Sequence, residues 1–600
     1  MKHLLPLFSL IAFFNFTNAQ SDLFVSNGSF VFVDGTGFTS DPNVAPLFVT
    51  DDVNIQNSGN IYLRNDAQLL QGTGTTGNSG FGELSVFQEG TVNQYAYNYW
   101  CSPIGAGSAS NGNDDFTVNL IDETTGLISS TDVAFTAGYN SSTGPLTISN
   151  RWLFTFIASD EYSEWVYNGE SGNINPGLGF TMKGVGTGVF GSQQYDFRGK
   201  PNNGTITNTV AAPVGGVDQW TLVGNPYPSA LDAADFIHDT QNSSNINGTL
   251  YFWEQQPGAS SHYIADYVGG YATYTINAAG TVESFTKATF LTYLQDGTPT
   301  ALPGTISPTT KQVRRYIPIG QGFMVSGTTN GTVRTTNAMR EFYKEADTDS
   351  EFFRTSEADS NTSDDEYSNS IPDDYKRFRI YVDFNDLYTR ELLMNFHSTA
   401  TDGFDYGLEG RSPEGPASDA YWVLDNVPYV IQAFDFNTDL RIPLVINLDE
   451  QMSLRVRIHD IQNFADDQPI YLHDKVNNTY TDLRYQDSNF NLESGAFSER
   501  YEITFTNEDT LTTEEISIND FLVFQDNSKE QLTVKNPNLL DVRSVTLYDT
   551  SGKQVFHKIG LDNQEIYHFS TKSLSDGIYV TVISTENGNS ISKKLVVKNK

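Results

Sequence analysis

Apolar and polar residues alternate in many short segments of this 600-residue chain. Three segments show the pattern most cleanly: Arg377–Asp383, Ser453–His459 and Tyr501–Phe505. Successive side chains of a strand point to opposite faces, so a period of two predicts strands with one buried and one exposed face. Stretches with the Leu, Ala, Glu and Lys content of helices are few. We therefore expect an all-β, multi-domain chain.

Short strands separated by Asn/Gly turns repeat between residues 20 and 94. Gly28–Val33, Asp52–Ile55 and Gly59–Arg64 are examples. Such a repeat predicts a short β-solenoid, in which each rung buries its apolar face against its neighbours. Strands of a β-sandwich are the alternative. The repeats are irregular in length, so both interpretations stay open.

Residues 95–340 contain longer strands that are rich in aromatic side chains, and two phrases in this region echo each other. Asn175–Met182 and Ile317–Val325 each place a proline and then Gly-x-Gly-Phe before a strand. The echo predicts a duplicated turn-to-strand unit, with Phe180 and Phe323 as core residues.

A change of composition at residues 341–374 predicts a linker. It holds twelve acidic residues against Lys344 and Arg354, and such a segment has too little apolar surface to offset its ordering entropy. The spacing Asp347-x-Asp349-x-Glu351 offers hard oxygen ligands for calcium, but the glycine turn and distal glutamate of a calcium loop are missing. A solvated linker is therefore the favoured interpretation of this segment, and calcium binding is the alternative. The alternating segments at residues 375–510 then predict a β-sandwich.

The first 19 residues have the pattern of a signal peptide. Lys2 and His3 precede an apolar run from Leu4 to Phe16, and Ala19 supplies a small residue at the expected cleavage site. The run is too short to span a membrane, and no later segment has about 20 apolar residues in succession. We expect export, with no transmembrane segment.

Composition narrows the class of partner and the source of stability. A formal net charge of -38 argues against nucleic acid and anionic membrane surfaces, since both would be repelled. The 49 glycines and the 13% aromatic content agree with a β-rich architecture. Cys101 is the single cysteine, so no intramolecular disulfide can form.

A search for catalytic motifs assigns no catalytic or cofactor-binding residue. Gly72–Gly77 and Gly186–Gly191 match G-x-G-x-x-G, but neither has the strand before and helix after that dinucleotide binding requires. His459 and His473 are a pair without a third ligand, which favours ordinary histidines over a zinc site. Cys101 has no basic neighbour in sequence, which favours a buried small hydrophobe over a nucleophile.

Paired carboxylates are the remaining catalytic hypothesis. A glycosidase places two carboxyl groups in a cleft between aromatic platforms. Surface solvation or calcium ligation is the alternative, and it is favoured in so acidic a chain. The sequence offers two sets of candidates: Asp402, Asp405 and Glu409, and Asp160 with Glu161 near Trp165.

The last segment, residues 515–600, has the alternation and turns of a small β-sandwich or meander. Its turns fall at Ser551-Gly552 and Asp576-Gly577. The segment resembles the type A C-terminal sorting domain of the type IX secretion system of Gram-negative bacteria. The residues that carry the resemblance are Leu547, Tyr548, Asp549, Gly552, Lys553, Leu574, Gly577, Ile578, Tyr579, Lys593 and Lys594.

One hallmark of that family is absent. A Tyr-Pro-Asn-Pro phrase usually precedes an early strand, whereas Phe521–Asn527 stands there in this chain. The resemblance implies recognition by the type IX secretion machinery, removal of the domain during export, and either attachment to surface lipopolysaccharide or release. Phrases such as Asn98–Ile104 also look like those of large surface proteins with the same sorting domain. The destination implied is the cell surface or the medium, reached through the periplasm.

Two functional classes are consistent with these observations. The first is a non-catalytic adhesin, glycan-binding protein or envelope component, in which exposed Trp and Tyr provide contact area. The second is a secreted hydrolase that acts on an extracellular polymer. The failed motif search favours the first.

Overall fold

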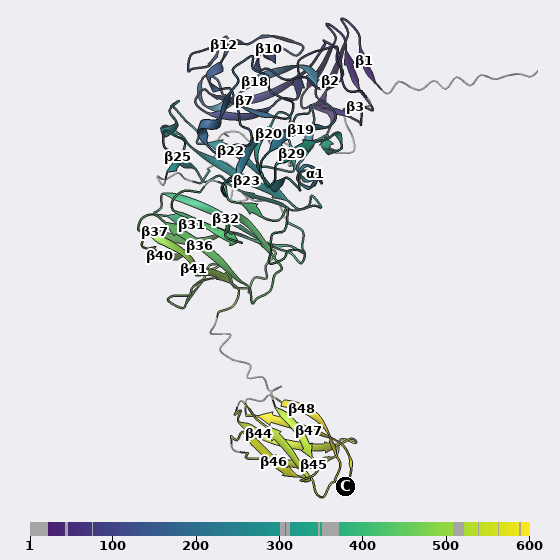
Figure 1. Ribbon diagram of the computed structural model, residues 1–600, viewed down its shortest axis with the longest axis vertical. Helices are drawn as coiled ribbons and strands as arrows, with labels where there is room; N and C mark the ends of the chain where they lie inside the picture. The colour runs from purple at the N-terminus through teal and green to yellow at the C-terminus, as the bar shows by residue number, and fades with distance from the viewer. Residues whose placement is uncertain are drawn as a thin grey trace, which may run out of the picture. The chain divides into compact units, whose positions relative to one another are not determined.

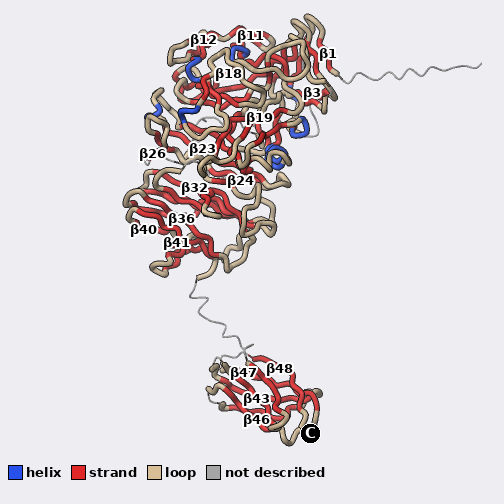
Figure 2. Tube along the Cα trace, viewed as in Figure 1, coloured by secondary structure: helices blue, strands red, loops and turns tan. Residues whose placement is uncertain are grey.

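The structure is a computed structural model (Figures 1 and 2). It describes residues 22–41, 46–74, 76–300, 306–307, 312–345, 349–350, 371–413, 415–507, 521–537, 539–561, 563–586 and 590–599. Contacts divide the chain into two compact units, Met1–Phe505 and Thr506–Lys600. Strands form nearly all of the regular structure, as Figure 2 shows, which confirms the all-β prediction. The predicted signal peptide and most of the predicted acidic linker lie outside the described residues.

The N-terminal strands form a short parallel β-solenoid. Parallel neighbours one turn of chain apart are the pairing of a solenoid, whereas a β-sandwich is built from antiparallel strands. Of the two interpretations left open by the sequence, the structure shows the first. The parallel pairs are β1 (Leu23–Val25) with β4 (Val53–Ile55), β2 (Phe30–Asp34) with β5 (Asn60–Arg64), β3 (Leu47–Val49) with β6 (Leu69–Gln71), and β5 with β7 (Glu83–Asn93).

The last rung of the solenoid continues into antiparallel structure, because β7 also pairs with the long strand β18 (Thr187–Pro201). The sheet thus runs β11-β10-β18-β7-β5-β2, and a short strand pairs with β18 off this path. The further strands are β9 (Ile104–Gly105), β10 (Ile121–Gly126), β11 (Ser129–Asp132), and a small sheet of β12 (Ala134–Thr136), β13 (Ser142–Thr143) and β14 (Leu146–Ser149).

The duplicated unit predicted from the sequence is present, and its two copies share one strand register. In the first copy β8 (Tyr97–Cys101) pairs with β17 (Gly179–Lys183), which places Cys101 opposite Gly179. In the second, β20 (Gln219–Gly224) pairs with β28 (Gly322–Gly327), which places Gly224 opposite Gly322. Phe180 and Phe323 follow the paired glycines and are fully buried, as expected of core residues.

Two sheets extend these copies. The first is ordered β16-β15-β17-β8, and the second β20-β28-β22-β23-β25-β26, with one more strand beside β23. The remaining elements of this region are β15 (Phe154–Thr155), β16 (Val166–Tyr167), β19 (Ile206–Val210), β21 (Ala230–Asp232), α1 (Ala233–His238), β22 (Ile246–Gln255), β23 (Val268–Ile276), β24 (Glu283–Thr286), β25 (Leu291–Tyr293), β26 (Pro299–Thr300), β27 (Tyr316–Ile317), β29 (Gly331–Thr335) and β30 (Arg340–Glu341).

Residues 376–504 form one continuous sheet of eleven strands around a single apolar core. Trp422 and Tyr501 are among its fully buried side chains. Its order is β39-β38-β41-β36-β34-β35-β32-β31-β37-β40, with β33 beside β35. The strands are β31 (Lys376–Phe384), β32 (Tyr388–Phe396), β33 (Gly410–Arg411), β34 (Asp419–Leu424), β35 (Val427–Phe434), β36 (Arg441–Leu448), β37 (Met452–Gln462), β38 (Tyr471–Asp474), β39 (Thr479–Asp482), β40 (Ser488–Leu492) and β41 (Gly495–Thr504).

This sheet packs directly on the aromatic-rich region. Glu391 is fully buried at the contact and accepts hydrogen bonds from the Arg379 guanidinium, at 2.7 Å, and from the backbone N–H of Lys287, at 2.9 Å. Arg379 also donates to the carbonyl of Phe285. A buried ion pair that satisfies backbone groups of its neighbour fixes one relative placement. Both regions therefore belong to one unit.

The second unit is a small β-sandwich of two sheets, ordered β42-β43-β46 and β45-β44-β47-β48. Its core includes Leu547, Tyr579 and Phe521, the first residue of the phrase that replaces the missing hallmark. The strands are β42 (Leu522–Asp526), β43 (Gln531–Lys535), β44 (Val542–Asp549), β45 (Gln554–Ile559), β46 (Ile566–Ser570), β47 (Gly577–Thr585) and β48 (Ser590–Val597).

Candidate functional site

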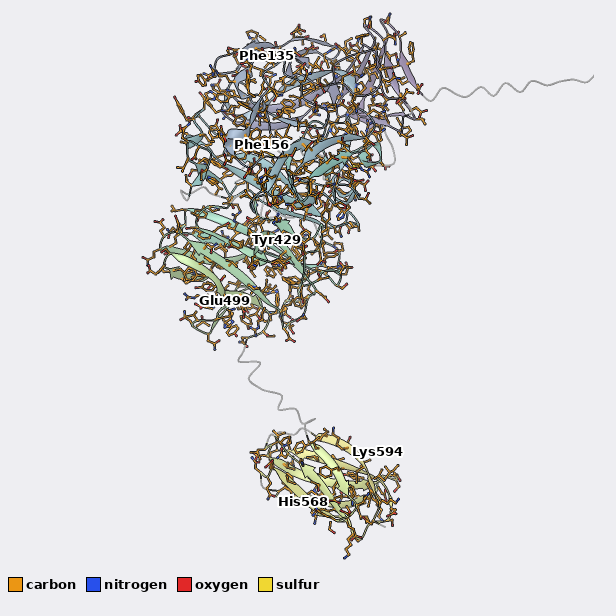
Figure 3. The ribbon with its side chains drawn as sticks, in the orientation of Figure 1. Phe135, Phe156, Tyr429, Glu499, His568 and Lys594 are labelled. Atoms are coloured by element: carbon orange, nitrogen blue, oxygen red, sulfur yellow. The ribbon has the colours of Figure 1, made fainter. Side chains whose placement is uncertain are left out.

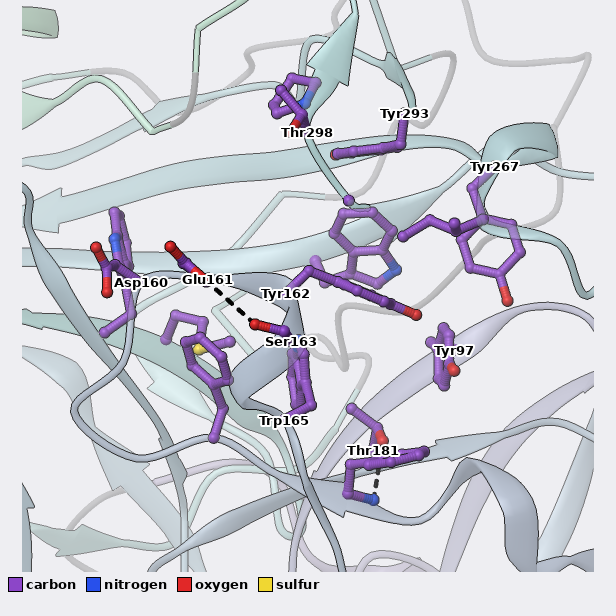
Figure 4. Close-up of a pocket in the computed structure, with 18 of the residues that line it drawn as sticks. Tyr97, Asp160, Glu161, Tyr162, Ser163, Trp165, Thr181, Tyr267, Tyr293 and Thr298 are labelled. Carbon is purple, nitrogen blue, oxygen red and sulfur yellow. Dashed lines mark hydrogen bonds between the residues drawn. The ribbon is translucent and has the colours of Figure 1, made fainter. Parts of the chain in front are cut away.

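The first unit contains a cavity of about 730 Å³ whose wall is mostly aromatic (Figure 4). Side chains from residues 97 to 324 line it, so distant parts of the chain meet there. Its volume is that of a typical ligand pocket. Eleven of the lining residues are aromatic: Tyr97, Tyr99, Phe154, Phe156, Tyr162, Trp165, Trp220, Trp253, Tyr267, Tyr271 and Tyr293.

The cavity lies where the two copies of the duplicated unit meet. Tyr99 of β8 is opposite Thr181 of β17, and Met324 of β28 holds the place of Thr181 in the second copy. All three line the cavity. Phe180 and Phe323 precede Thr181 and Met324 in sequence, so they point to the opposite faces, into two separate apolar cores. Each copy thus uses one face for stability and the other for the cavity.

The rings of the wall hold one another in place. Tyr99 and Trp253 stack with their planes at 15° and their centroids 6.3 Å apart. The Tyr99 and Tyr271 hydroxyls are 2.9 Å apart, within hydrogen-bond distance. Trp165 packs on Phe156 at 4.7 Å. Because these rings support one another, this part of the wall is organised before any ligand arrives.

Carboxylates accompany the rings, as the sequence anticipated for Asp160 and Glu161 near Trp165. Both carboxylates and Trp165 line the cavity, and Asp296 joins them from another loop. The turn that carries them is held by Glu164, which accepts hydrogen bonds from the N–H groups of Asp160 and Glu161 at 2.9 and 3.1 Å. These bonds favour the charged form and lower the pKa of Glu164.

The loop with Asp296 packs tightly on the turn at residues 160–165. Gly297 has φ +91°, and a Cβ there would lie 2.3 Å from the Cβ of Tyr162. Glycine is therefore required where the two loops meet. Asp296 accepts a hydrogen bond from the N–H of Thr298 at 3.0 Å, which lowers the pKa of its carboxyl. The two acidic loops thus form one side of the cavity.

Lys183 lies behind the aromatic wall, almost fully buried. Its ammonium is 3.9 Å from the ring centre of Trp152 and 4.7 Å from that of Tyr97, and it donates to the Tyr267 hydroxyl. Burial lowers its pKa to about 7, with no carboxylate among the causes. His262, 3.1 Å away, has its pKa lowered to about 4 by burial and by Lys183. Rings and a hydroxyl replace the usual carboxylate partner of this cation.

Lys183 should make the free energy of unfolding depend on pH. An unfolded lysine has a pKa of about 10.4. Below pH 7 the group is protonated in both states, so the cost of burying the charge is fully present. Between about pH 8 and 10 only the unfolded state keeps the proton, so stability gains about 1.4 kcal/mol per pH unit from this residue. We expect urea unfolding of Lys183→Met to lack this slope. Parallel pH profiles for the wild type and Lys183→Met would contradict the assignment.

The other sequence-derived candidates do not join this site. Glu409 is fully buried, and burial raises its pKa to about 8. It accepts a hydrogen bond from the N–H of Asp405, so it supports a loop. His459 and His473 lie on β37 and β38, near opposite ends of the strand order of their sheet. Cys101 is fully buried, which raises the pKa of its thiol. Within the described residues, no cluster of His, Cys, Asp or Glu has the form of a metal site.

The calcium hypothesis at Asp347, Asp349 and Glu351 falls partly outside the described residues. Asp349 is described, and it pairs with Arg314. An aspartate engaged by a guanidinium is already neutralised by a cation. Calcium binding at this segment stays a prediction.

The predicted sorting residues divide into two groups in the second unit. Leu547 and Tyr579 belong to its core, and Asp549 closes the turn by accepting from the N–H groups of Ser551 and Lys553. Lys594, in contrast, is exposed on β48 (Figure 3). The fold requires the first group, whereas the second is free to meet a partner. The other residues that carry the resemblance to the sorting domain also lie in this unit: Tyr548, Gly552, Leu574, Gly577, Ile578 and Lys593.

Comparison with known protein families gives two matches. Residues 24–505 match the family described as Domain of unknown function (DUF8693). The chain belongs to this family. The DUF8693 region coincides with the first unit and contains the whole aromatic cavity.

The second match is to the Secretion system C-terminal sorting domain, over residues 527–598. It coincides with the second unit and confirms the resemblance seen in the sequence. This DUF8693 protein is therefore exported by the type IX secretion system and is secreted or located at the cell surface. Among the described residues, no helix has the length and apolar character to cross a membrane.

Other comparisons are less informative. No curated protein matches the chain. The lipoprotein Tp47 of Treponema pallidum is similar at 7% identity and a TM-score of 0.11, over 62% of this chain and 92% of that one. The BSP domain of a biofilm associated protein is similar at 8% identity and a TM-score of 0.11, over 88% of this chain and 98% of that one. These TM-scores support no inference from either protein.

Proposed function

We propose that this exported protein binds an extracellular glycan in the aromatic cavity, as an adhesin or envelope component, and does not cleave it. The observation that carries the proposal is the convergence of eleven aromatic side chains on one cavity of about 730 Å³. Tyr and Trp present an apolar face and a polar edge, as sugar rings do. Stacking on the rings and hydrogen bonds to hydroxyls and carboxylates together suit a ligand of this kind.

The charge of the lining supports neutral glycans over anionic ones. Asp160, Glu161 and Asp296 line the cavity, and its described lining includes no Lys, Arg or His. Lys183 is separated from the space by the rings of Tyr97 and Tyr267. A uronate or sulfate would therefore meet like charge in a partly desolvated site.

The acidity of Asp296 supports binding over hydrolysis. A glycosidase needs a general acid whose pKa is raised. The pKa of Asp296 is lowered instead, by its backbone hydrogen bond. Burial raises the pKa of Glu341 to about 7 and that of Glu409 to about 8, but neither lines the cavity.

Isothermal titration of residues 20–600 with oligosaccharides tests the proposal. The panel pairs neutral hexose tetrasaccharides with uronic acid oligomers of the same length, and chromatography follows each mixture for products. We expect at least one neutral oligosaccharide to bind, no uronate to bind, and no shorter product to form. Release of shorter sugars would select the hydrolase, and a lack of binding by every neutral oligosaccharide would contradict the proposal.

A further inference from the structure

The N-terminal end of the solenoid is an open sheet edge. β1, β2 and β3 each pair on one side only, with β4, β5 and β6. In the described residues no strand pairs with their other side. The three strands lie at the periphery of the first unit (Figure 1). Their outward N–H and C=O groups are therefore available to another strand.

Both the outer faces and the end of the core are apolar at this edge. Phe24, Phe30 and Phe48 are 56%, 59% and 59% exposed on the outside. Val31 and Leu47 point inward but are only partly buried, because no further rung covers them. Asp34 is the only charged residue in the three strands. Natural edges are usually protected by charges, prolines or a polar capping repeat, and within the three described strands Asp34 is the one such residue.

We propose that a second copy of this chain covers the edge. With a net charge of -38, most surfaces of two copies repel each other. The first rung, formed by β1, β2 and β3, carries almost no charge, so two copies can meet there with little repulsion. A basic partner would form few ion pairs with this edge. Two identical apolar edges, in contrast, can bury their apolar surface against each other without desolvating charged groups.

The edge is also complementary to itself. β1 and β3 have the same sequence, Leu-Phe-Val, and the same order of partly buried, exposed and buried residues. A twofold axis through β2 brings β1 of one copy beside β3 of the other, and it makes all pairs antiparallel. With the axis at Val31, Phe30 lies opposite Phe32 of the other copy in the β2 pair, and outer faces meet outer faces while inner faces meet inner faces.

Sedimentation equilibrium of residues 20–600 tests the proposal first. We expect the mass of a dimer for the wild type and of a monomer for Phe24→Lys/Phe48→Lys. Both phenylalanines are exposed, so the fold should survive, and an unchanged melting temperature would verify it. Phe81→Lys is the matched control, since Phe81 is 57% exposed but lies outside the first rung. A monomeric wild type, or a dimer that persists in the double variant, would overturn the proposal.

Cross-linking tests the pairing itself. Under mild oxidation a mixture of Phe30→Cys and Phe32→Cys should form a disulfide-linked dimer, and each variant alone should form much less. Cys101 is fully buried and should stay silent. A mixture of Phe81→Cys and Phe32→Cys serves as control. Equal cross-linking in the control, or none in the first mixture, would rule out the twofold arrangement. Glycan binding in the cavity does not depend on either outcome.

Discussion

Replacing Trp253 with alanine is expected to weaken glycan binding by about 30-fold, which corresponds to about 2 kcal/mol. Trp253 lies at the centre of the cavity wall, between Tyr99, Tyr271 and Tyr293. Its removal deletes an indole stacking surface and leaves the neighbouring rings without support. Titration with the neutral oligosaccharide that binds best measures the effect.

The sequence around Trp253 shows why this ring has one position. Gly269 of β23 pairs with Gln255, two residues along β22 from Trp253, and a Cβ at Gly269 would lie 2.9 Å from the indole. The glycine leaves room for the ring to lie flat on the neighbouring strand. Trp253 is thus a preorganised platform, and its truncation should reduce affinity more than a substitution at a loop.

Two further variants separate lost stacking from lost structure. Trp253→Phe keeps a smaller ring, so most of the affinity should return. Tyr485→Ala removes an aromatic side chain that is 78% exposed and distant from the cavity in sequence and sheet, and it should bind like the wild type. Wild-type affinity in Trp253→Ala, with an unchanged melting temperature, would show that the ligand binds elsewhere.

Local sequence patterns predict much of the fold. Alternation correctly predicted strands at Arg377–Asp383 and Tyr501–Phe505. The expected exposed face is wrong for both segments, because the structure buries their polar positions as well as their apolar ones. The echo around Phe180 and Phe323 predicted a duplication, because the same turn and core residue recur. Solenoid and sandwich could not be distinguished at Gly28–Val33, because both use short strands and differ only in partner direction.

The site was predicted only in part, for the same reason. Asp160, Glu161 and Trp165 are close in sequence, so their proximity was visible. Trp253 and Tyr271 pair with each other on consecutive strands, but they meet Tyr99 through contacts between residues far apart in sequence, which leave no local signal. The sequence signal for these residues is the aromatic enrichment of residues 95–340. It indicates that this region offers aromatic contact area, but it does not show where a site lies.

Deleting Leu574–Lys600 is expected to trap the protein in the periplasm. The deletion removes β47 and β48, and with them Ile583, Leu595 and Val597 from the core of the sorting domain. It also removes the exposed Lys594. The first unit has its own cores and its own boundary, so it should stay folded. Cell fractionation and protease treatment of intact cells locate the protein, and normal surface delivery of the truncated chain would contradict the assignment.

A point variant separates recognition from folding in this experiment. Lys594→Glu reverses one exposed charge on β48 without touching the core, so the domain should fold and melt as before. Tyr579→Ala removes a core ring whose hydroxyl donates to the carbonyl of Ser575, and it should cost about 3 kcal/mol or more. If the machinery reads the surface, Lys594→Glu should reduce delivery while the domain stays folded. If it requires only a folded domain, Tyr579→Ala alone should fail, and Lys594 would then have no part in sorting.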